Sequence, residues 1–350
     1  MRLEWQRSTI RDIPLYYNPK VSGLRMDTST NPLGANPAAK EALKECLEMD
    51  LNQYPSPYSD SLRAALGELY SLPADNFVVG NGSDEALDII FKSFLEPGEA
   101  VVLPYPGYSL HSYFVKVNAG RPVFVDLKSD FQLDVEGLNK AKGKVILLCN
   151  PNNPTSNTFR RQDIEALIDG VPDRIVVIDE AYGEFAGRSF IPELEDYENV
   201  VVTRTFSKAY ALAGMRIGYA VSNGELANVM QRVKIPYSLN RVSEMVALKA
   251  LKDQDFVKHS VKVVNEGRRQ LHEGLERLGF EVFLSEANFI LFKGKMDHKQ
   301  LVDRLARKGV MIRDFGDKRR LENCVRTTIG TEKMNQLLLD KIAEVLREWR

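Results

Sequence analysis

The sequence predicts an α/β protein built around a mostly parallel sheet. Short runs rich in β-branched residues alternate with amphipathic helical stretches through the middle of the 350-residue chain. Several of these runs are apolar throughout, which is typical of strands covered by helices on both faces. The seven strand candidates are Phe77–Val79, Ala100–Leu103, Pro122–Val125, Val145–Cys149, Ile175–Ile178, Val200–Thr203 and Ile217–Val221. Helical patterns between them, such as Glu85–Phe94 and Gln162–Asp169, complete βαβ units.

Beyond about residue 250 the pattern changes. A long charged helical stretch, Asp253–Leu278, is followed by short strand candidates and ends in an amphipathic helix over Glu332–Trp349. These strand candidates are Phe280–Leu284, Phe289–Phe292, Val310–Arg313 and Cys324–Ile329. We therefore expect three parts: residues 1–51 as an N-terminal arm and part of a small domain, residues 52–250 as a large domain, and residues 251–350 as a small C-terminal α+β domain.

The composition excludes several classes of protein. The 47 basic and 48 acidic residues nearly cancel, which argues against a surface that wraps nucleic acid. The three cysteines are scattered and the four histidines lack zinc spacing, so free thiols and no metal site are expected. No apolar run approaches the roughly 18 residues of a membrane span, and the charged N-terminus is no secretory signal. These features favour a cytoplasmic protein without nucleic-acid or membrane partners.

The segment from Arg204 to Gly218 contains the most informative residue, Lys208. This lysine lies among small and apolar residues, with Thr205 and Ser207 before it and Arg216 after it. A lysine in such surroundings can lose its proton and form a Schiff base with a carbonyl carbon. The hydroxyls and the guanidinium could hold a phosphate. This combination suits pyridoxal phosphate, an aldehyde that carries a phosphate group.

Two further strand ends carry candidate residues. Asp179 follows an apolar strand, where a buried carboxylate could keep a pyridinium nitrogen protonated, and Tyr182 could donate to a ring oxygen. The alternative is an acid that caps a helix or holds a loop. Asn153 lies in a turn dense in Asn and Pro and is either a rigid hydrogen-bond donor or part of an ordinary turn.

The strand end at Gly80-Asn81-Gly82-Ser83 supports two interpretations. Ser83 is a plausible helix N-cap, and the free N–H groups behind it would bind a phosphate. Gly80 and Gly82 also resemble the start of a dinucleotide fingerprint, but Glu85 stands at the third glycine position and no ribose-binding acid follows the next strand. A nicotinamide enzyme is therefore the weaker alternative.

Three aromatic and basic residues complete the set. Tyr108 follows a strand and could lie on a flat cofactor or simply in the core. Arg313 and Arg326 lie in two of the strand candidates. Each could bind a carboxylate or phosphate, or form a surface ion pair.

Together, in this order, these elements resemble the class I/II aminotransferases of the fold-type-I pyridoxal-phosphate enzymes, and most of all the histidinol-phosphate aminotransferase family. The resemblance runs from about Ser29 to Thr331. Its matching elements are Asn31-Pro32-Leu33-Gly34, Tyr54-Pro55, Gly82-Ser83-Asp84-Glu85, Pro106-x-Tyr108, Asn150-Pro151-Asn152-Asn153-Pro154-Thr155, Asp179-Glu180-Ala181-Tyr182, Ser207-Lys208 through Arg216, and Val325-Arg326.

The resemblance implies a role for each candidate residue. Lys208 would form the Schiff base and move the proton, Asp179 would pair with the pyridine nitrogen, and Tyr108 would stack on the ring. Tyr182 and Asn153 would bond the ring hydroxyl oxygen. The phosphate would be held by Ser83, Asp84, Thr205, Ser207 and Arg216. Tyr54 would reach the cofactor of a partner subunit, which implies a homodimer. Arg326, with Arg313, Asn153 and Tyr17, would bind the substrate.

The chain departs from the family pattern at two places. Ser156 replaces a usual glycine, and the N-terminal arm has Tyr16-Tyr17-Asn18-Pro19-Lys20 instead of a Tyr-x-Pro-Gly element. The implied reaction is reversible amino transfer between histidinol phosphate and 2-oxoglutarate. Alternatives on the same scaffold are an aromatic or other amino-acid aminotransferase, a threonine-phosphate decarboxylase, whose expected N-terminal His-Gly-Gly is absent, and a non-catalytic pyridoxal-phosphate-binding regulator.

Overall fold

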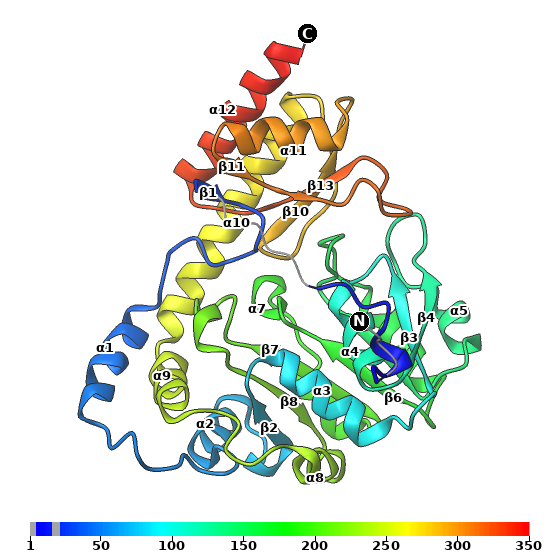
Figure 1. Cartoon of the computed structure of the whole chain (residues 1–350), viewed down its shortest axis with the longest axis vertical. Coiled ribbons are helices and arrows are strands. Elements are labelled where there is room, and N and C mark those ends of the chain that lie inside the picture. Colours follow the sequence, from blue (N-terminus) through cyan, green and yellow to red (C-terminus); the bar gives the residue numbers. More distant parts are fainter. Residues whose placement is uncertain (1–4, 16–21, 350) are drawn as a thin grey trace.

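The computed structural model describes residues 5–15 and 22–349, and a seven-stranded sheet forms the centre of the described chain (Figure 1). The strand order is β2-β8-β7-β6-β5-β3-β4. Strand β8 is antiparallel to both of its neighbours, and the other neighbouring pairs are parallel. The predicted α/β class and the mostly parallel sheet are confirmed. The strands are β2 (Phe77–Gly80), β3 (Ala100–Tyr105), β4 (Arg121–Asp126), β5 (Val145–Cys149), β6 (Ile175–Asp179), β7 (Val200–Thr205) and β8 (Gly218–Ser222).

Helices cover both faces of this sheet, as the apolar strands predict. One face packs against α3, α4 and α8, and the other against α2, α6, α7 and α9. The helices up to residue 252 are α1 (Pro37–Glu45), α2 (Asp60–Tyr70), α3 (Ser83–Phe94), α4 (Ser109–Val117), α5 (Val135–Lys140), α6 (Arg161–Asp169), α7 (Gly183–Ala186), α8 (Gly224–Val233) and α9 (Arg241–Lys252).

The alternation of side chains along a strand decides which residues face which core. In β6, Val177 packs in the core beside α3, whereas Val176 and Ile178 pack in the opposite core. Asp179 therefore shares the face of Val177. Its neighbour Glu180 turns to the other side, where its carboxylate pairs with the buried Arg204 at 3.1 Å.

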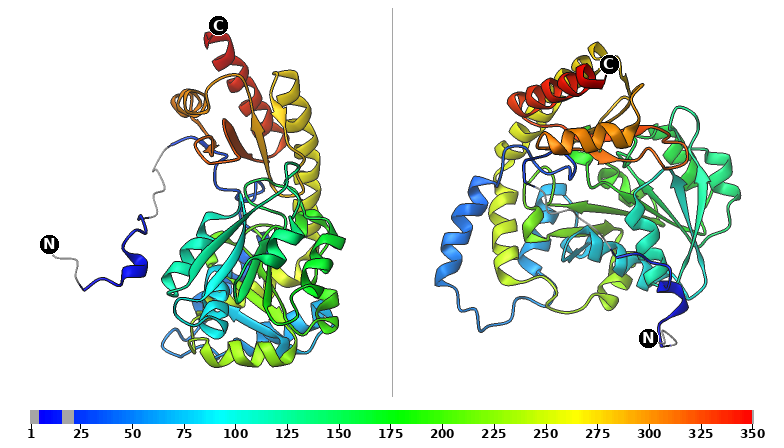
Figure 2. Two further views of the ribbon diagram at one scale, coloured as in Figure 1. Left: turned by 90° about the vertical axis from the view of Figure 1, so that its right-hand side faces the viewer. Right: turned by 45° about the horizontal axis from the view of Figure 1, so that its top comes forward.

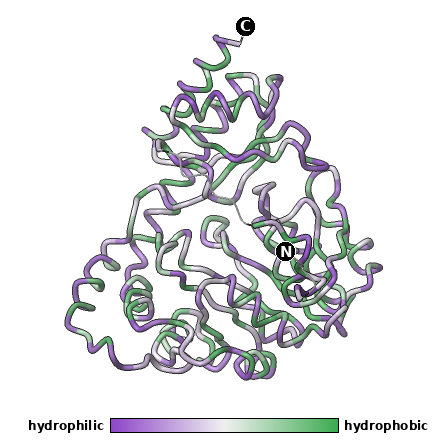
Figure 3. Tube along the Cα trace, viewed as in Figure 1, coloured by the Kyte–Doolittle hydropathy of each residue, from purple (hydrophilic) through white to green (hydrophobic). Residues whose placement is uncertain are grey.

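A second, four-stranded antiparallel sheet lies beyond the carboxyl ends of the parallel strands (Figure 1). Its order is β12-β13-β10-β9, and it packs with three helices. These elements are β9 (Glu281–Val282), β10 (Phe289–Lys293), β12 (Arg313–Asp314), β13 (Cys324–Thr328), α10 (Gln254–Arg277), α11 (His298–Arg307) and α12 (Glu332–Trp349). Hydrophobic and hydrophilic residues alternate along α12, whose Leu338, Ile342 and Val345 are buried (Figure 3).

The predicted strand Val310–Arg313 is wrong in one respect, because it is two strands in two sheets. Val310–Met311 (β11) pairs in parallel with Leu24–Arg25 (β1), and Arg313–Asp314 pairs with β13. The apolar pattern runs through Ile312, so the change of partner leaves no sign in the sequence. The pairing of β1 with β11 joins the N-terminal segment to the C-terminal elements, although the proposed boundaries at residues 51 and 250 stay a prediction.

The described part of the N-terminal arm, residues 5–15, lies on the outside of the molecule beside α4 (Figure 2). It contains the short 3₁₀ turn Ser8–Ile10. In the described part of the chain no helix is both long and apolar enough to cross a membrane.

Candidate active site

Lys208 lies where two adjoining cavities meet, between the two sheets. It lies three residues after the end of β7, in the connection that runs to β8. The first cavity measures about 170 Å³ and the second about 230 Å³, and both are lined by Thr28, Tyr108, Tyr182 and Lys208. The backbone at Lys208 is held from the N-terminal segment, because the Asn31 amide donates to the carbonyl oxygens of Lys208 and Ala209 at 3.1 Å each.

One end of the first cavity collects groups that suit a phosphate. Ser83 begins α3, and Thr205, Ser207 and Arg216 converge on the same place from β7 and the connection to β8. The Thr205 hydroxyl donates to Ser207 Oγ at 3.0 Å and accepts from the Ser207 N–H at 3.1 Å. Gly82 precedes the helix with φ +88°, and a Cβ there would come within 2.8 Å of the Arg216 guanidinium. A helix N-terminus, two hydroxyls and a guanidinium form an anion site.

Two details of this end differ from expectation. Ser83 is the first residue of α3, not its N-cap, because Gly82 occupies the cap position and Ser83 makes no capping bond. The positive φ at Gly82 places the helix start one residue earlier than the Ser signal indicates. The carboxylate of Asp84 accepts from Arg216 at 2.7 Å, so Asp84 could serve an anion only through its backbone N–H.

The lining of the first cavity also contains the buried carboxylate of Asp179. Oδ2 of Asp179 lies 3.0 Å from Nε2 of His111, and Oδ1 accepts from the Thr203 hydroxyl at 3.1 Å and from the Ala181 N–H at 3.2 Å. These contacts fix the carboxylate at the end of β6. Asp179 does not cap the following helix, because α7 starts at Gly183 without a side-chain cap, but its bond from the Ala181 N–H does hold the loop after β6.

Neither His111 nor Thr203 stood out in the sequence as a site residue. A usable signal exists for His111, because it follows Tyr108 by three positions and so shares its face of α4. The two rings meet edge to face at 5.3 Å. Thr203 has the same strand parity as Thr205, which also places it on the cavity side of β7.

The second cavity contains the anion-binding candidate Arg326. Its guanidinium donates to Asn153 Oδ1 at 2.5 Å and to the Asp27 carbonyl at 3.1 Å, and it lies over the Phe289 ring at 4.6 Å. Asn153 in turn donates to the Tyr182 hydroxyl at 3.2 Å. Burial lowers the pKa of Arg326, and burial raises the pKa of Tyr182. The predicted partner Arg313 lies opposite Arg326 in the β12–β13 ladder and also lines the cavity.

The environment of Lys208 makes its amine easier to deprotonate than a lysine in water. Burial, with the positive charge of Arg326 nearby, lowers the pKa of Lys208 from 10.5 to about 8. The ammonium group lies 5.6 Å from the centre of the Tyr182 ring. A lowered pKa makes a lysine a better nucleophile and base near neutral pH.

One predicted residue, Tyr54, lies outside both cavities. Tyr54 is 82% exposed and packs against Tyr237 with ring centres 5.0 Å apart, away from both cavities. Tyr17 lies outside the described residues. Ser156, the departure from the family's glycine, keeps a left-handed backbone with φ +66°.

Comparison with known proteins identifies the family. The sequence model of the family aminotransferase class I and II matches residues 23–342 of this chain. The chain belongs to this family. One curated relative is the histidinol-phosphate aminotransferase of Pyrococcus furiosus, which is 37% identical over 93% of each chain. Another is the histidinol-phosphate aminotransferase of Caldanaerobacter subterraneus subsp. tengcongensis, which is 34% identical over 92% of this chain and 93% of the relative. The solved histidinol-phosphate aminotransferase of Sinorhizobium meliloti, in complex with pyridoxal-5'-phosphate, superimposes with a TM-score of 0.90 at 28% identity over 98% of each chain.

The residues of this aminotransferase-family chain fit pyridoxal phosphate. The first cavity is lined by an anion site, by a fixed carboxylate and by an amine of lowered pKa. These are the groups that a phosphate, a pyridine nitrogen and an aldehyde require, respectively. Within the described chain no group of three or more His, Cys, Asp or Glu side chains could hold a metal ion.

Proposed function

We propose that the protein transfers an amino group reversibly between histidinol phosphate and 2-oxoglutarate, with imidazole acetol phosphate and glutamate as the products. Curated relatives of this name share 34–37% identity with more than nine-tenths of the chain. The observation that carries the proposal is the position of Lys208 between an anion site at the start of α3 and a second cationic cavity at Arg326. A cofactor phosphate and a substrate anion need two separate sites on either side of one amine.

Pyridoxal phosphate, when bound, supplies an aldehyde that takes up amino groups and a ring that withdraws electrons from the adjacent carbon. Lys208 would attach to it and would later carry the proton at the substrate's α-carbon, which its lowered pKa favours. Asp179, oriented by His111 and Thr203, would hold the proton of the ring nitrogen. Tyr108 would cover one face of the ring.

The remaining roles follow from the two cavities. Ser83, Thr205, Ser207 and Arg216, with the backbone of Asp84, would bind the cofactor phosphate. This end would fix the cofactor with charge-assisted bonds that contribute about 1.5–3 kcal/mol each.

The second cavity would hold the substrate. Asn153 and Tyr182 would contact the ring oxygen, and Arg326 with Arg313 would bind the substrate anion. Because Arg326 already donates to Asn153, substrate binding and ring contacts would share one hydrogen-bond chain.

We also propose a homodimer in which Tyr54 reaches the partner's cofactor phosphate. Large apolar side chains are exposed together around the connections α1–α2 and α8–α9, where a monomer would leave them in water. They are Leu47 (81% exposed), Leu51 (71%), Tyr54, Ile235 (62%) and Tyr237. Tyr54 lines neither cavity of its own chain, which a role across an interface would explain. A cytoplasmic location remains a prediction, consistent with three buried free cysteines.

The function is tested with purified protein and a substrate panel. The visible band of the bound cofactor should shift when histidinol phosphate or glutamate is added, and Lys208→Ala should lose the band of the attached cofactor. A response to aromatic amino acids with none to histidinol phosphate would refute the substrate and leave the aminotransferase class. An unchanged visible spectrum in Lys208→Ala would refute the role of Lys208. Sedimentation velocity of the wild type decides the homodimer.

A further inference from the structure

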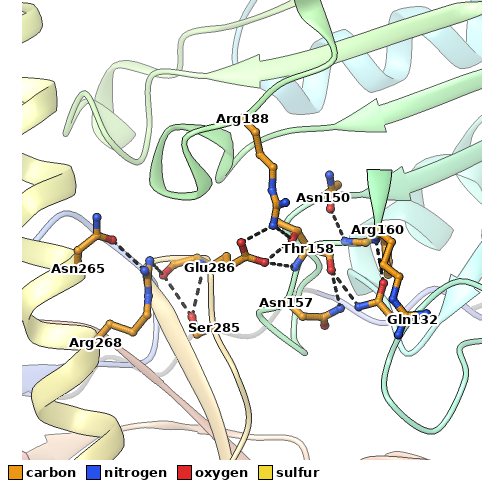
Figure 4. Close-up of polar contacts among 12 residues, drawn as sticks. Gln132, Asn150, Asn157, Thr158, Arg160, Arg188, Asn265, Arg268, Ser285 and Glu286 are labelled. Carbon is orange, nitrogen blue, oxygen red and sulfur yellow. Dashed lines mark hydrogen bonds and ion pairs between the residues drawn. The ribbon is translucent and has the colours of Figure 1, made fainter. Parts of the chain in front are cut away.

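A carboxylate outside both cavities joins the two sheets next to the site. Glu286 lies in the connection between β9 and β10, and its Oε2 accepts from the backbone N–H of Thr158 at 3.2 Å and from the Thr158 hydroxyl (Figure 4). The backbone N–H of Glu286 donates to the Ser156 carbonyl at 2.7 Å. Residues 156–158 therefore bond to the connection at residue 286 through both side chain and backbone.

Arg188, which follows α7, closes this contact from a third element. Its guanidinium donates both to Glu286 Oε1 and to the Thr158 hydroxyl (Figure 4). The ion pair is half exposed, with 49% of the Arg188 side chain and 38% of the Glu286 side chain accessible. Charge attraction alone therefore contributes little to stability. The ion pair instead fixes geometry, because three segments far apart in sequence meet at the Glu286 carboxylate.

The connection that carries Glu286 is itself fixed to the long helix α10. Arg268 donates to the Ala287 carbonyl at 2.9 Å and to Asn265 Oδ1 at 2.8 Å. The Ser285 hydroxyl donates to the Phe289 carbonyl at 2.6 Å. Glu286 thus extends from a connection that is hydrogen-bonded to α10, and it bonds from there to the turn at residues 156–158.

That turn carries Asn153, and the braced connection leads into Phe289. Phe289 lies under the Arg326 guanidinium and meets the Tyr182 ring at 4.9 Å, and Asn153 bonds both Arg326 and Tyr182. The two ends of the Asn153–Arg326 bond therefore belong to different sheets. Outside the cavities, the Glu286 side chain bonds the turn after β5 to the connection that leads into β10, the neighbour of β13.

We propose that Glu286 is a positioning residue that sets the distance between Asn153 and Arg326, and so the affinity for the substrate anion. This inference rests on the proposed function, in which Arg326 binds that anion. Ser156, which replaces the family's usual glycine, bonds the same two segments. Its hydroxyl donates to the Leu284 carbonyl at 3.3 Å.

The experiment compares three variants of the full-length holoenzyme. Glu286→Ala removes the acceptor of Thr158, Glu286→Gln keeps one amide oxygen for it, and Asp130→Ala is the matched control. Asp130 pairs with Arg160 at 2.9 Å, about half exposed and close to the same turn, but both partners lie in the part of the chain that forms the first sheet. The measurements are KM and kcat for L-glutamate with imidazole acetol phosphate, the affinity for pyridoxal phosphate, and hydrogen exchange of residues 152–158.

Glu286→Ala should raise KM for L-glutamate about tenfold, because misplacing a binding group by a fraction of an ångström costs that order of affinity. The cofactor affinity and kcat should change less than about threefold. Exchange at the Thr158 amide should accelerate at least about tenfold, since its acceptor is gone. Glu286→Gln should recover most of KM, and Asp130→Ala should match the wild type.

Two results would overturn the proposal. One is an unchanged KM and unchanged exchange in Glu286→Ala. The other is a parallel loss of melting temperature and cofactor affinity in Glu286→Ala and in Arg188→Met, which would make the cluster a general support of the fold. A wild type that transfers no amino group would refute the proposed function instead, and the exchange of residues 152–158 would still decide whether Glu286 positions the turn.

Discussion

Replacement of Lys208 by methionine should make the protein without cofactor more stable at neutral pH. Methionine fills a similar volume without a charge, whereas Lys208 must be buried as an ammonium group whenever it is protonated. The pKa falls from 10.5 to about 8 on folding. Each pKa unit corresponds to 1.36 kcal/mol, so the charge costs about 3 kcal/mol at pH 7. Solvent in the two cavities that Lys208 lines will reduce this value, and we expect a gain of about 1–3 kcal/mol.

The sign of the pH dependence follows from the lowered pKa. Below pH 8 the lysine is protonated in the folded and the unfolded chain, and the full cost is present. Between pH 8 and 10.5 the folded protein releases the proton while the unfolded chain keeps it, so the wild type gains stability as pH rises. The advantage of Lys208→Met should therefore shrink to about 1 kcal/mol or less by pH 10.

Urea unfolding of both cofactor-free proteins at pH 7, 9 and 10 measures this difference. Lys252→Met, at the exposed end of α9, is the control and should change stability by less than about 0.5 kcal/mol. If Lys208→Met is no more stable than the wild type at pH 7, or if the difference is the same at pH 10, the inferred cost of burying the ammonium is wrong.

Three further predictions concern the surroundings of the site. His111→Phe removes a hydrogen bond to the Asp179 carboxylate and should lower kcat about tenfold, with a shifted pH titration of the visible cofactor band. Ser156→Gly should change the unfolding free energy by less than about 1 kcal/mol, because relief of a left-handed backbone and loss of the hydroxyl contacts nearly cancel, as urea unfolding would show. Arg204→Met leaves two buried glutamates without their cation and should cost about 3–5 kcal/mol, measured as a large fall in melting temperature.

The sequence contained the positions of the parallel strands and the polar residues that follow them. Apolar runs bounded by turn residues place β5, β6 and β7 within two residues of their observed ends. Asp179 comes directly after one predicted run, and Lys208 lies three residues beyond the end of β7. The meeting of these residues at one cavity follows from the rule that ligands bind beyond the carboxyl ends of parallel strands. Pairings between distant segments could not be obtained in this way. β1 pairs with β11 across nearly 300 residues. Each of these strands is two residues long, which is too short to show a hydrophobic periodicity.

The same limit explains why Glu286 was missed while Asn153, in the turn that Glu286 contacts at Thr158, was predicted. Asn153 lies in a turn that is dense in Asn and Pro, so the local sequence marks it. Glu286 is one acid among 48, and its importance comes only from the meeting of the β9–β10 connection with Thr158, 128 residues away in sequence. Groups that bind a cofactor must be of particular chemical types, which a sequence displays. Groups that position them need only reach the right place, and that place exists only once the two sheets have come together.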